Sequence, residues 1–147
     1  MEILILGIIL VALMAYVSTR IKKSAARAFE REVVEAEDFS IVKPEGFLSP
    51  AGENSENAFE AYSKDFGEND AAAEYRKATV KIYKKSGQSE RLPSESEKTE
   101  KGVTIQTFRK MLKNNEKSYE LEISVLKDYR EQYFDKINEM LSSFSVK

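Results

Sequence analysis

The chain has 147 residues, of which 33% are charged, and its formal net charge at neutral pH is -2. Nucleic-acid-binding domains usually carry a basic excess, so this balance argues against nucleic acid as a partner. The lack of cysteine excludes disulfides, thiolate metal sites and a cysteine nucleophile, and the lack of histidine removes the commonest general base and metal ligand.

The first 19 residues form an apolar segment that is long enough to cross a membrane. No charged residue follows Glu2 until Arg20. Seventeen helical residues span roughly 25 Å, and long basic side chains can extend this toward the ~30 Å hydrocarbon core. We therefore predict a transmembrane anchor at residues 1–19. A cleaved signal peptide is the less favoured alternative, because no basic residue precedes the apolar run and no small-x-small cleavage site follows it.

Basic residues follow the apolar segment and none precedes it. The positive-inside rule therefore predicts that the N-terminus lies outside and the C-terminal domain lies in the cytoplasm. A tyrosine near the end of the segment suits the membrane interface as well. The predicted interface residues are Tyr16, Arg20, Lys22, Lys23 and Arg27.

A juxtamembrane helix is predicted at residues 20–38. Apolar residues recur there at spacings of three and four, as on one face of a helix. They are Ile21, Ala25, Phe29, Val33 and Ala36. A solvated stalk and a partner-binding helix are both consistent with this pattern.

The soluble domain is predicted to occupy residues 39–147. Alternation in Phe39 to Lys43 predicts a strand, and Pro44-Glu45-Gly46 predicts a type I turn with proline and glycine at its second and fourth positions. A short helix is expected at residues 58–66. Residues 71–85 are expected to start as a short helix or loop and to become a strand near Ala78.

The last third of the chain has clearer patterns. Residues 86–102 are rich in Ser, Glu, Lys and Gly and predict a mobile loop. A helix is expected at residues 104–113, and strict alternation predicts a half-buried strand from Tyr119 to Val125. A final helix is expected at residues 128–144. Its apolar face comprises Tyr129, Tyr133, Phe134, Ile137, Met140, Leu141 and Phe144.

Two groups of residues resemble PsbP/Mog1-like domains. The first matches a Phe-x-Ile strand followed by a Pro-x-Gly-aromatic turn, and consists of Phe39, Ile41, Pro44, Gly46 and Phe47. The second matches a short helix, expected here from Thr104 to Leu112, then a Tyr-x-Leu-x-Ile strand and a closing helix. The residues of this strand and closing helix are Tyr119, Leu121, Ile123, Ile137, Met140, Leu141, Ser143 and Phe144. The chain departs from the family in having Phe47 in place of tryptophan and few clear strands in its middle. Its anchor also predicts a cytoplasmic domain, whereas many bacterial relatives are exported.

The resemblance implies an antiparallel sheet covered by helices and a non-catalytic role in binding a partner or assisting a membrane complex. With the anchor, the predicted fold class is α+β: one N-terminal transmembrane helix, then a small antiparallel sheet covered by helices. The alternative is an all-helical bundle or coiled stalk, in which residues 71–85 and 104–144 are entirely helical.

The sequence offers little for catalysis. Without histidine, a serine nucleophile needs a lysine base, and the pairs Ser24–Lys23 and Ser63–Lys64 are neighbours only in sequence. The acidic residues Glu95, Glu97 and Glu100 fall in the predicted mobile loop, which cannot hold catalytic geometry. No phosphate-binding or calcium-binding loop has the required spacing. We predict no catalytic, cofactor-binding or metal-ligating residue.

Two functions fit these observations. The favoured one is a non-enzymatic accessory or interaction protein that is anchored in a membrane and docks on a larger membrane protein complex. The alternative is a ligand-binding module with an apolar pocket between the sheet and the C-terminal helix, although the sequence names no ligand. A membrane-bound enzyme ranks third.

Overall fold

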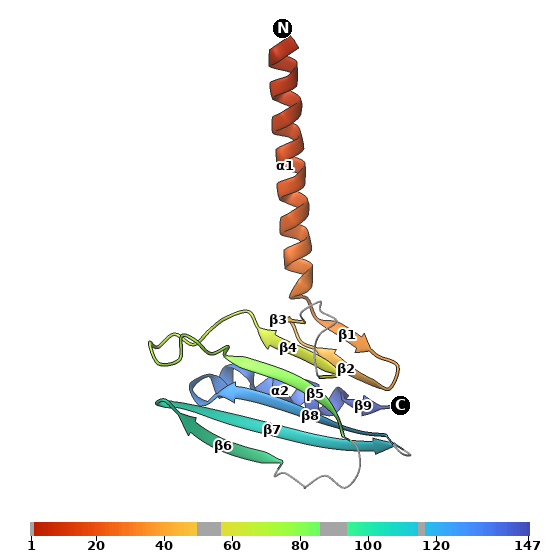
Figure 1. Ribbon diagram of the computed structural model, residues 1–147, viewed down its shortest axis with the longest axis vertical. Helices are drawn as coiled ribbons and strands as arrows, with labels where there is room; N and C mark the ends of the chain where they lie inside the picture. Colours follow the sequence, from red (N-terminus) through yellow and green to blue (C-terminus); the bar gives the residue numbers. More distant parts are fainter. Residues whose placement is uncertain (1, 50–56, 86–93, 115–116) are drawn as a thin grey trace.

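The computed structural model describes residues 2–49, 57–85, 94–114 and 117–147, without the side chains of residues 23–26. A long N-terminal helix leads into two antiparallel sheets and a C-terminal helix (Figure 1). This confirms the predicted α+β class and excludes the all-helical alternative. The helices are α1 (Glu2–Ala28) and α2 (Arg130–Ser143), with a 3-10 turn, η1 (Lys127–Tyr129), before α2. The strands are β1 (Glu32–Glu35), β2 (Phe39–Lys43), β3 (Phe47–Leu48), β4 (Phe59–Ser63), β5 (Ala78–Lys85), β6 (Glu95–Glu100), β7 (Val103–Asn114), β8 (Lys117–Leu126) and β9 (Ser145–Val146).

The apolar N-terminal segment is one continuous helix. Its stretch Glu2–Lys22 has a mean hydropathy of 2.2, and none of it is buried against the rest of the chain. At 1.5 Å per residue, the 27 residues of α1 extend about 40 Å. This length matches a bilayer with its headgroup regions, which measures about 40–45 Å.

The juxtamembrane helix predicted at residues 20–38 is wrong beyond Ala28. The chain instead folds into the hairpin of β1 and β2, and the domain therefore begins before Phe39. Two β-branched residues decide this change, because they suit a strand better than a helix. Val34 packs against the core, whereas Val33, which the helical pattern placed on the apolar face, is 54% exposed.

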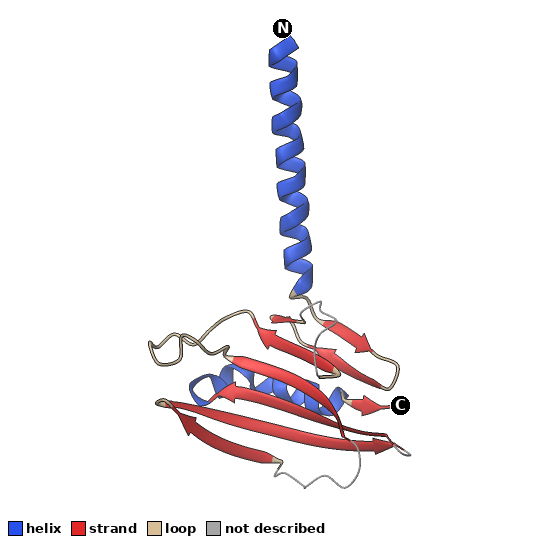
Figure 2. Cartoon of the chain, in the orientation of Figure 1, coloured by secondary structure: helices blue, strands red, loops and turns tan. Residues whose placement is uncertain are grey.

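The two sheets have the orders β1-β2-β9 and β3-β4-β5-β8-β7-β6, and every pairing is antiparallel. In Figures 1 and 2 the strands of the larger sheet follow one another away from α1, from β3 near the helix to β6 at the far side. Neighbouring strands are displaced within the plane of their sheet. The sheet therefore runs roughly parallel to the axis of α1, like a wall.

The core fills the layer between this wall, the smaller sheet and α2. Alternate residues of β5 and β8 point into it, as the predicted strands near Ala78 and Tyr119 require. The fully buried ones include Val80, Ile82, Leu121 and Ile123. The final helix is confirmed, and Tyr133, Ile137 and Met140 of its predicted apolar face are buried. Phe134 is the exception at 51% exposure.

The tight turn after β2 differs by one position from the predicted type I turn. The amide of Phe47 donates to the carbonyl of Pro44 at 3.4 Å, so Pro44 begins the turn. Gly46 then occupies the third position with a φ of 89°, the positive φ that a type II turn requires there.

Two predicted helices in the middle of the chain are strands. Residues 58–66 contain β4, and residues 104–113 lie within β7, which pairs with β8 from Ile105 to Asn114. In β7 the side chains of Gln106 and Phe108 face α2, whereas a helix would have placed Phe108 and Met111 together. A twelve-residue strand with a partner strand on each side is stabilised more by cross-strand side-chain pairs than a helix would be by its apolar spacing.

Part of the predicted mobile loop at residues 86–102 is also a strand. Residues 86–93 lie outside the described residues, but Glu95–Glu100 form the edge strand β6. A two-residue turn makes this hairpin. Lys101 and Gly102 both have positive φ, 52° and 80°, which is the pattern of a type I′ turn and its right-handed strand twist.

Candidate functional site: the junction of helix and domain

The predicted membrane-interface residues all belong to α1. Tyr16, Arg20, Lys22 and Arg27 are exposed, and Lys23 lies in the stretch whose side chains are not described. At 100° per residue, Tyr16, Arg20 and Arg27 fall on one stripe of the helix, with Lys22 on the other side. From Tyr16 to Arg27 the helix rises about 17 Å, so the tyrosine and the last arginine lie at different depths.

A buried lysine closes the end of α1 and joins it to the domain. The ammonium of Lys43 donates hydrogen bonds to the carbonyls of Ala28 and Glu30, both at 2.9 Å, and to that of Phe47 at 2.7 Å. Helix carbonyls at the C-terminus have no partner within the helix and carry partial negative charge. A cation is favourable there. Lys43 thus clamps α1 to the turn between β2 and β3.

The clamp is enclosed. Lys43 is only 3% exposed, and burial lowers the pKa of its ammonium, while Glu32 and Glu30 raise that pKa in partial compensation. Three carbonyl acceptors use all three donors of the ammonium, so the buried charge is fully hydrogen-bonded. Burial of an unpaired charge would be costly, and this arrangement avoids it.

Further contacts surround the clamp. The amide of Gly46 donates to the carbonyl of Phe29 at 2.7 Å, and the ammonium of Lys64 lies 5.7 Å from the centre of the Phe29 ring. Arg31 pairs with Glu139 of α2 at 2.7 Å. The last pair is exposed and therefore contributes little stability by itself. Together these contacts hold the end of α1 against the turn, the β4 end and α2.

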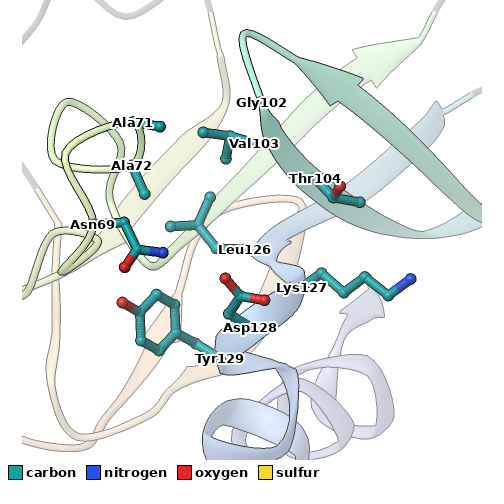
Figure 3. A pocket seen from close by; sticks show the side chains of 10 residues that line it. All are labelled: Asn69, Ala71, Ala72, Gly102, Val103, Thr104, Leu126, Lys127, Asp128 and Tyr129. Carbon is teal, nitrogen blue, oxygen red and sulfur yellow. The ribbon is translucent and has the colours of Figure 1, made fainter.

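A small cleft lies at the other end of the wall, where β8 passes into η1 (Figure 3). Its volume is about 130 Å³, enough for a handful of water molecules. The side chains of Asn69, Asp128 and Tyr129 project toward it in Figure 3. The amide of Glu68 donates to the Tyr129 hydroxyl at 2.8 Å, and the ammonium of Lys77 lies 4.4 Å from the centre of the same ring.

The place predicted for an apolar ligand pocket is occupied by the protein itself. Between the sheet and α2, Phe47 and Tyr133 meet edge to face at 5.8 Å between ring centres, and Met140 is 1% exposed. In the described ranges, no group of three or more acidic side chains is placed to hold a metal ion.

Sequence reasoning missed Lys43 as the residue that orders the junction. The signal was present in the alternation of β2, because Phe39, Ile41 and Lys43 share its inward face. A lysine at the third inward position of a strand needs buried acceptors. The pattern cannot say which carbonyls supply them.

No protein-family model and no curated protein sequence matches this chain. Among solved structures, the solution structure of cyanobacterial PsbP (CyanoP) from Synechocystis sp. PCC 6803 is similar to it. The sequence identity is 10% and the TM-score is 0.46, over 80% of this chain and 92% of that one. That protein belongs to the group that the sequence motifs resemble, and at 10% identity the similarity concerns the path of the backbone and not the function.

Proposed function

We propose that this chain is a membrane-anchored, non-enzymatic accessory protein that docks on a larger membrane protein complex. The N-terminus lies outside, α1 spans the bilayer, and the domain lies in the cytoplasm. Tyr16, Arg20, Lys22, Lys23 and Arg27 lie at the inner membrane interface. The observation that carries the proposal is the exposed apolar helix ending directly in the Lys43 clamp.

The geometry of the junction supports an anchor over a removed signal segment. With Glu2–Lys22 as the membrane span, and Arg20 and Lys22 at its inner interface, six further residues bring α1 to Ala28, a rise of about 9 Å. This distance corresponds to the headgroup layer. The clamp then begins where the aqueous phase begins, so the domain is held against the membrane surface in a defined orientation.

Membrane topology is tested on the full chain in its native membrane. We expect the protein to resist alkaline extraction, to keep the residues of α1, and to be digested by protease only when the cytoplasmic side is opened. A mature chain beginning after Thr19, or digestion from outside intact cells, contradicts the anchor or its orientation respectively.

The role of the basic flank is tested by replacing Arg20, Lys22 and Arg27 with glutamate. We expect a substantial fraction of the chains to insert with the opposite orientation, because the positive-inside signal is reversed. The matched control replaces Lys84, Lys98 and Lys101 of the domain with glutamate, which gives the same net charge and an unchanged flank. Equal behaviour of the two variants contradicts the assignment of the interface residues.

Docking is tested by native electrophoresis after mild detergent extraction. We expect the protein to migrate with a larger membrane complex and to fall to its own size when α1 is replaced by an unrelated transmembrane helix that lacks the clamp geometry. Migration as a monomer before any replacement contradicts the accessory role.

A further inference from the structure

The open face of the larger sheet points sideways. Because the strands recede from α1 in the order β3 to β6, the plane of the sheet runs along the helix axis (Figure 1). One face of the wall packs on α2 and the core, and the other carries the alternate, half-exposed residues of β5, β7 and β8. If α1 spans the membrane, this face stands perpendicular to the membrane surface and is turned toward neighbouring membrane proteins.

Most charges in the middle of this face are compensated within the sheet. Arg109 lies 3.4 Å from Glu122 and 4.0 Å from Glu120, and it also donates to the Ser96 hydroxyl at 2.9 Å. The register places Lys81 directly opposite Glu122 on one side and Glu60 on the other. This central row is therefore nearly neutral.

One end of the face differs. Lys85 and Lys113 both lie directly opposite Ser118, one on each side, so about 10 Å separates their backbones across β8. Within the described residues, neither ammonium has a carboxylate at ion-pair distance. Among the residues that the structure describes, this end is therefore basic, although the whole chain has a net charge of -2.

The adjacent row combines an aromatic ring and a thioether. Tyr83 and Met111 lie directly opposite Glu120 from its two sides, and Glu120 is only 3% exposed. Burial and the neighbouring carboxylates raise the pKa of the Tyr83 phenol, so the ring carries a neutral hydroxyl. Met111 is 39% exposed. Tyrosine and methionine are enriched at protein interfaces because they provide large contact area.

Two other occupants of this end are unfavourable. Strand spacing of about 4.8 Å puts β5 roughly 10 Å and β7 roughly 19 Å from the β3 edge that lies nearest α1, which is beyond the reach of lipid headgroups. A symmetric second copy would bring Lys85 and Lys113 against the same lysines. Like charges across an interface disfavour that pairing.

We propose that Tyr83, Lys85, Met111 and Lys113 form the docking patch for an acidic segment of a neighbouring membrane protein, outside the bilayer and on the same side as the domain. This rests on the proposed function, since it requires a partner in the same membrane. The carboxylates of the segment lie between the two lysines, and an apolar side chain of the segment packs on the ring and the thioether.

The test places a photo-crosslinking amino acid at Met111 of the full-length protein in native membranes. We expect one membrane protein to be captured, through a peptide that lies outside the bilayer and carries more acidic than basic residues. The double variant Lys85→Glu with Lys113→Glu should lower the yield about tenfold. The matched control, Lys84→Glu with Lys98→Glu, has the same net charge and should retain the yield, because Lys84 points to the opposite face of β5.

A crosslinker at Phe134, which is 51% exposed on α2, separates the possible failures. Capture of a membrane protein from Phe134 but not from Met111 overturns the docking patch and leaves the accessory role in place. Capture of lipid, of a second copy of this chain or of a basic peptide from Met111 also overturns the patch. If neither position captures a protein while the chain remains in the membrane, the accessory role itself fails.

Discussion

Replacement of Lys43 by methionine keeps the length and apolar stem of the side chain and removes the ammonium. The acceptor Phe47 carbonyl is buried, and the carbonyls of Ala28 and Glu30 are partly buried. An unsatisfied buried acceptor costs about 1–3 kcal/mol, and the partly buried carbonyls cost less because water can reach them. Release of the lysine from its own burial offsets part of this. We expect the domain to lose about 2–4 kcal/mol of stability.

Urea unfolding of the full chain in detergent micelles, followed by circular dichroism, measures this loss. At a slope typical of small domains, the midpoint should fall by roughly 1–2 M. A second measurement concerns the junction itself. Spin labels placed on α1 and on β5 should show a single narrow distance distribution in the natural protein and a broad one in the Lys43→Met variant.

The control is Lys64→Met, which removes an exposed cation beside Phe29 at the same junction and should change stability by less than about 0.5 kcal/mol. If Lys43→Met unfolds at the same urea concentration as the natural protein, and its distance distribution stays narrow, Lys43 does not tie α1 to the domain.

Three further predictions concern the domain. Hydrogen bonds from Lys117 and Tyr119 lower the pKa of Asp38. The stability that the Asp38 carboxylate contributes is therefore present above pH about 4 and is lost as the pH falls through the lowered pKa. The unfolding curves of Asp38→Asn and of the natural protein should converge at acid pH. Ile137→Ala should cost about 2–5 kcal/mol in thermal or urea unfolding, because the side chain is 3% exposed in the core, and a loss below 1 kcal/mol would show that α2 packs loosely. Gly67→Ala should destabilise the domain more than Gly102→Ala, because a Cβ at Gly67 would lie 2.6 Å from the Ala72 carbonyl oxygen. At Gly102 a Cβ would meet open space, so alanine there costs only the about 1–2 kcal/mol of its positive φ. The reverse order in urea unfolding would contradict this packing.

Patterns of apolar residues predicted the elements whose environment is simple. A long apolar helix needs only an unbroken apolar run, and α1 follows that run. Strand β8 and helix α2 each bury one face against the same core, so their periods of two and 3.6 residues are visible in the sequence. The same alternation placed Phe39 and Ile41 together on the inner face of β2.

The predictions of a loop and a helix for residues 95–114 were wrong for a physical reason. In β7 the residues Ile105, Phe108 and Met111 have helical spacing, yet the strand is stabilised by β6 and β8 on both sides, which local sequence cannot reveal. Strand β6 carries no apolar residue, so its pattern resembles a solvated loop. The Lys101-Gly102 turn was the usable signal, because a glycine preceded by a residue that can adopt positive φ suits a two-residue hairpin.

The sequence alone determined that the chain carries a membrane-length helix with a basic flank, contains no cysteine or histidine, and has an amphipathic helix after its last long strand. These properties depend on local composition and periodicity. Only the tertiary structure decided that α1 stops at Ala28, that Lys43 caps it, and that Tyr83 and Met111 share one face with Lys85 and Lys113. Each of these depends on which distant strands pair and in which register, and a shift of one residue would turn every side chain to the other face.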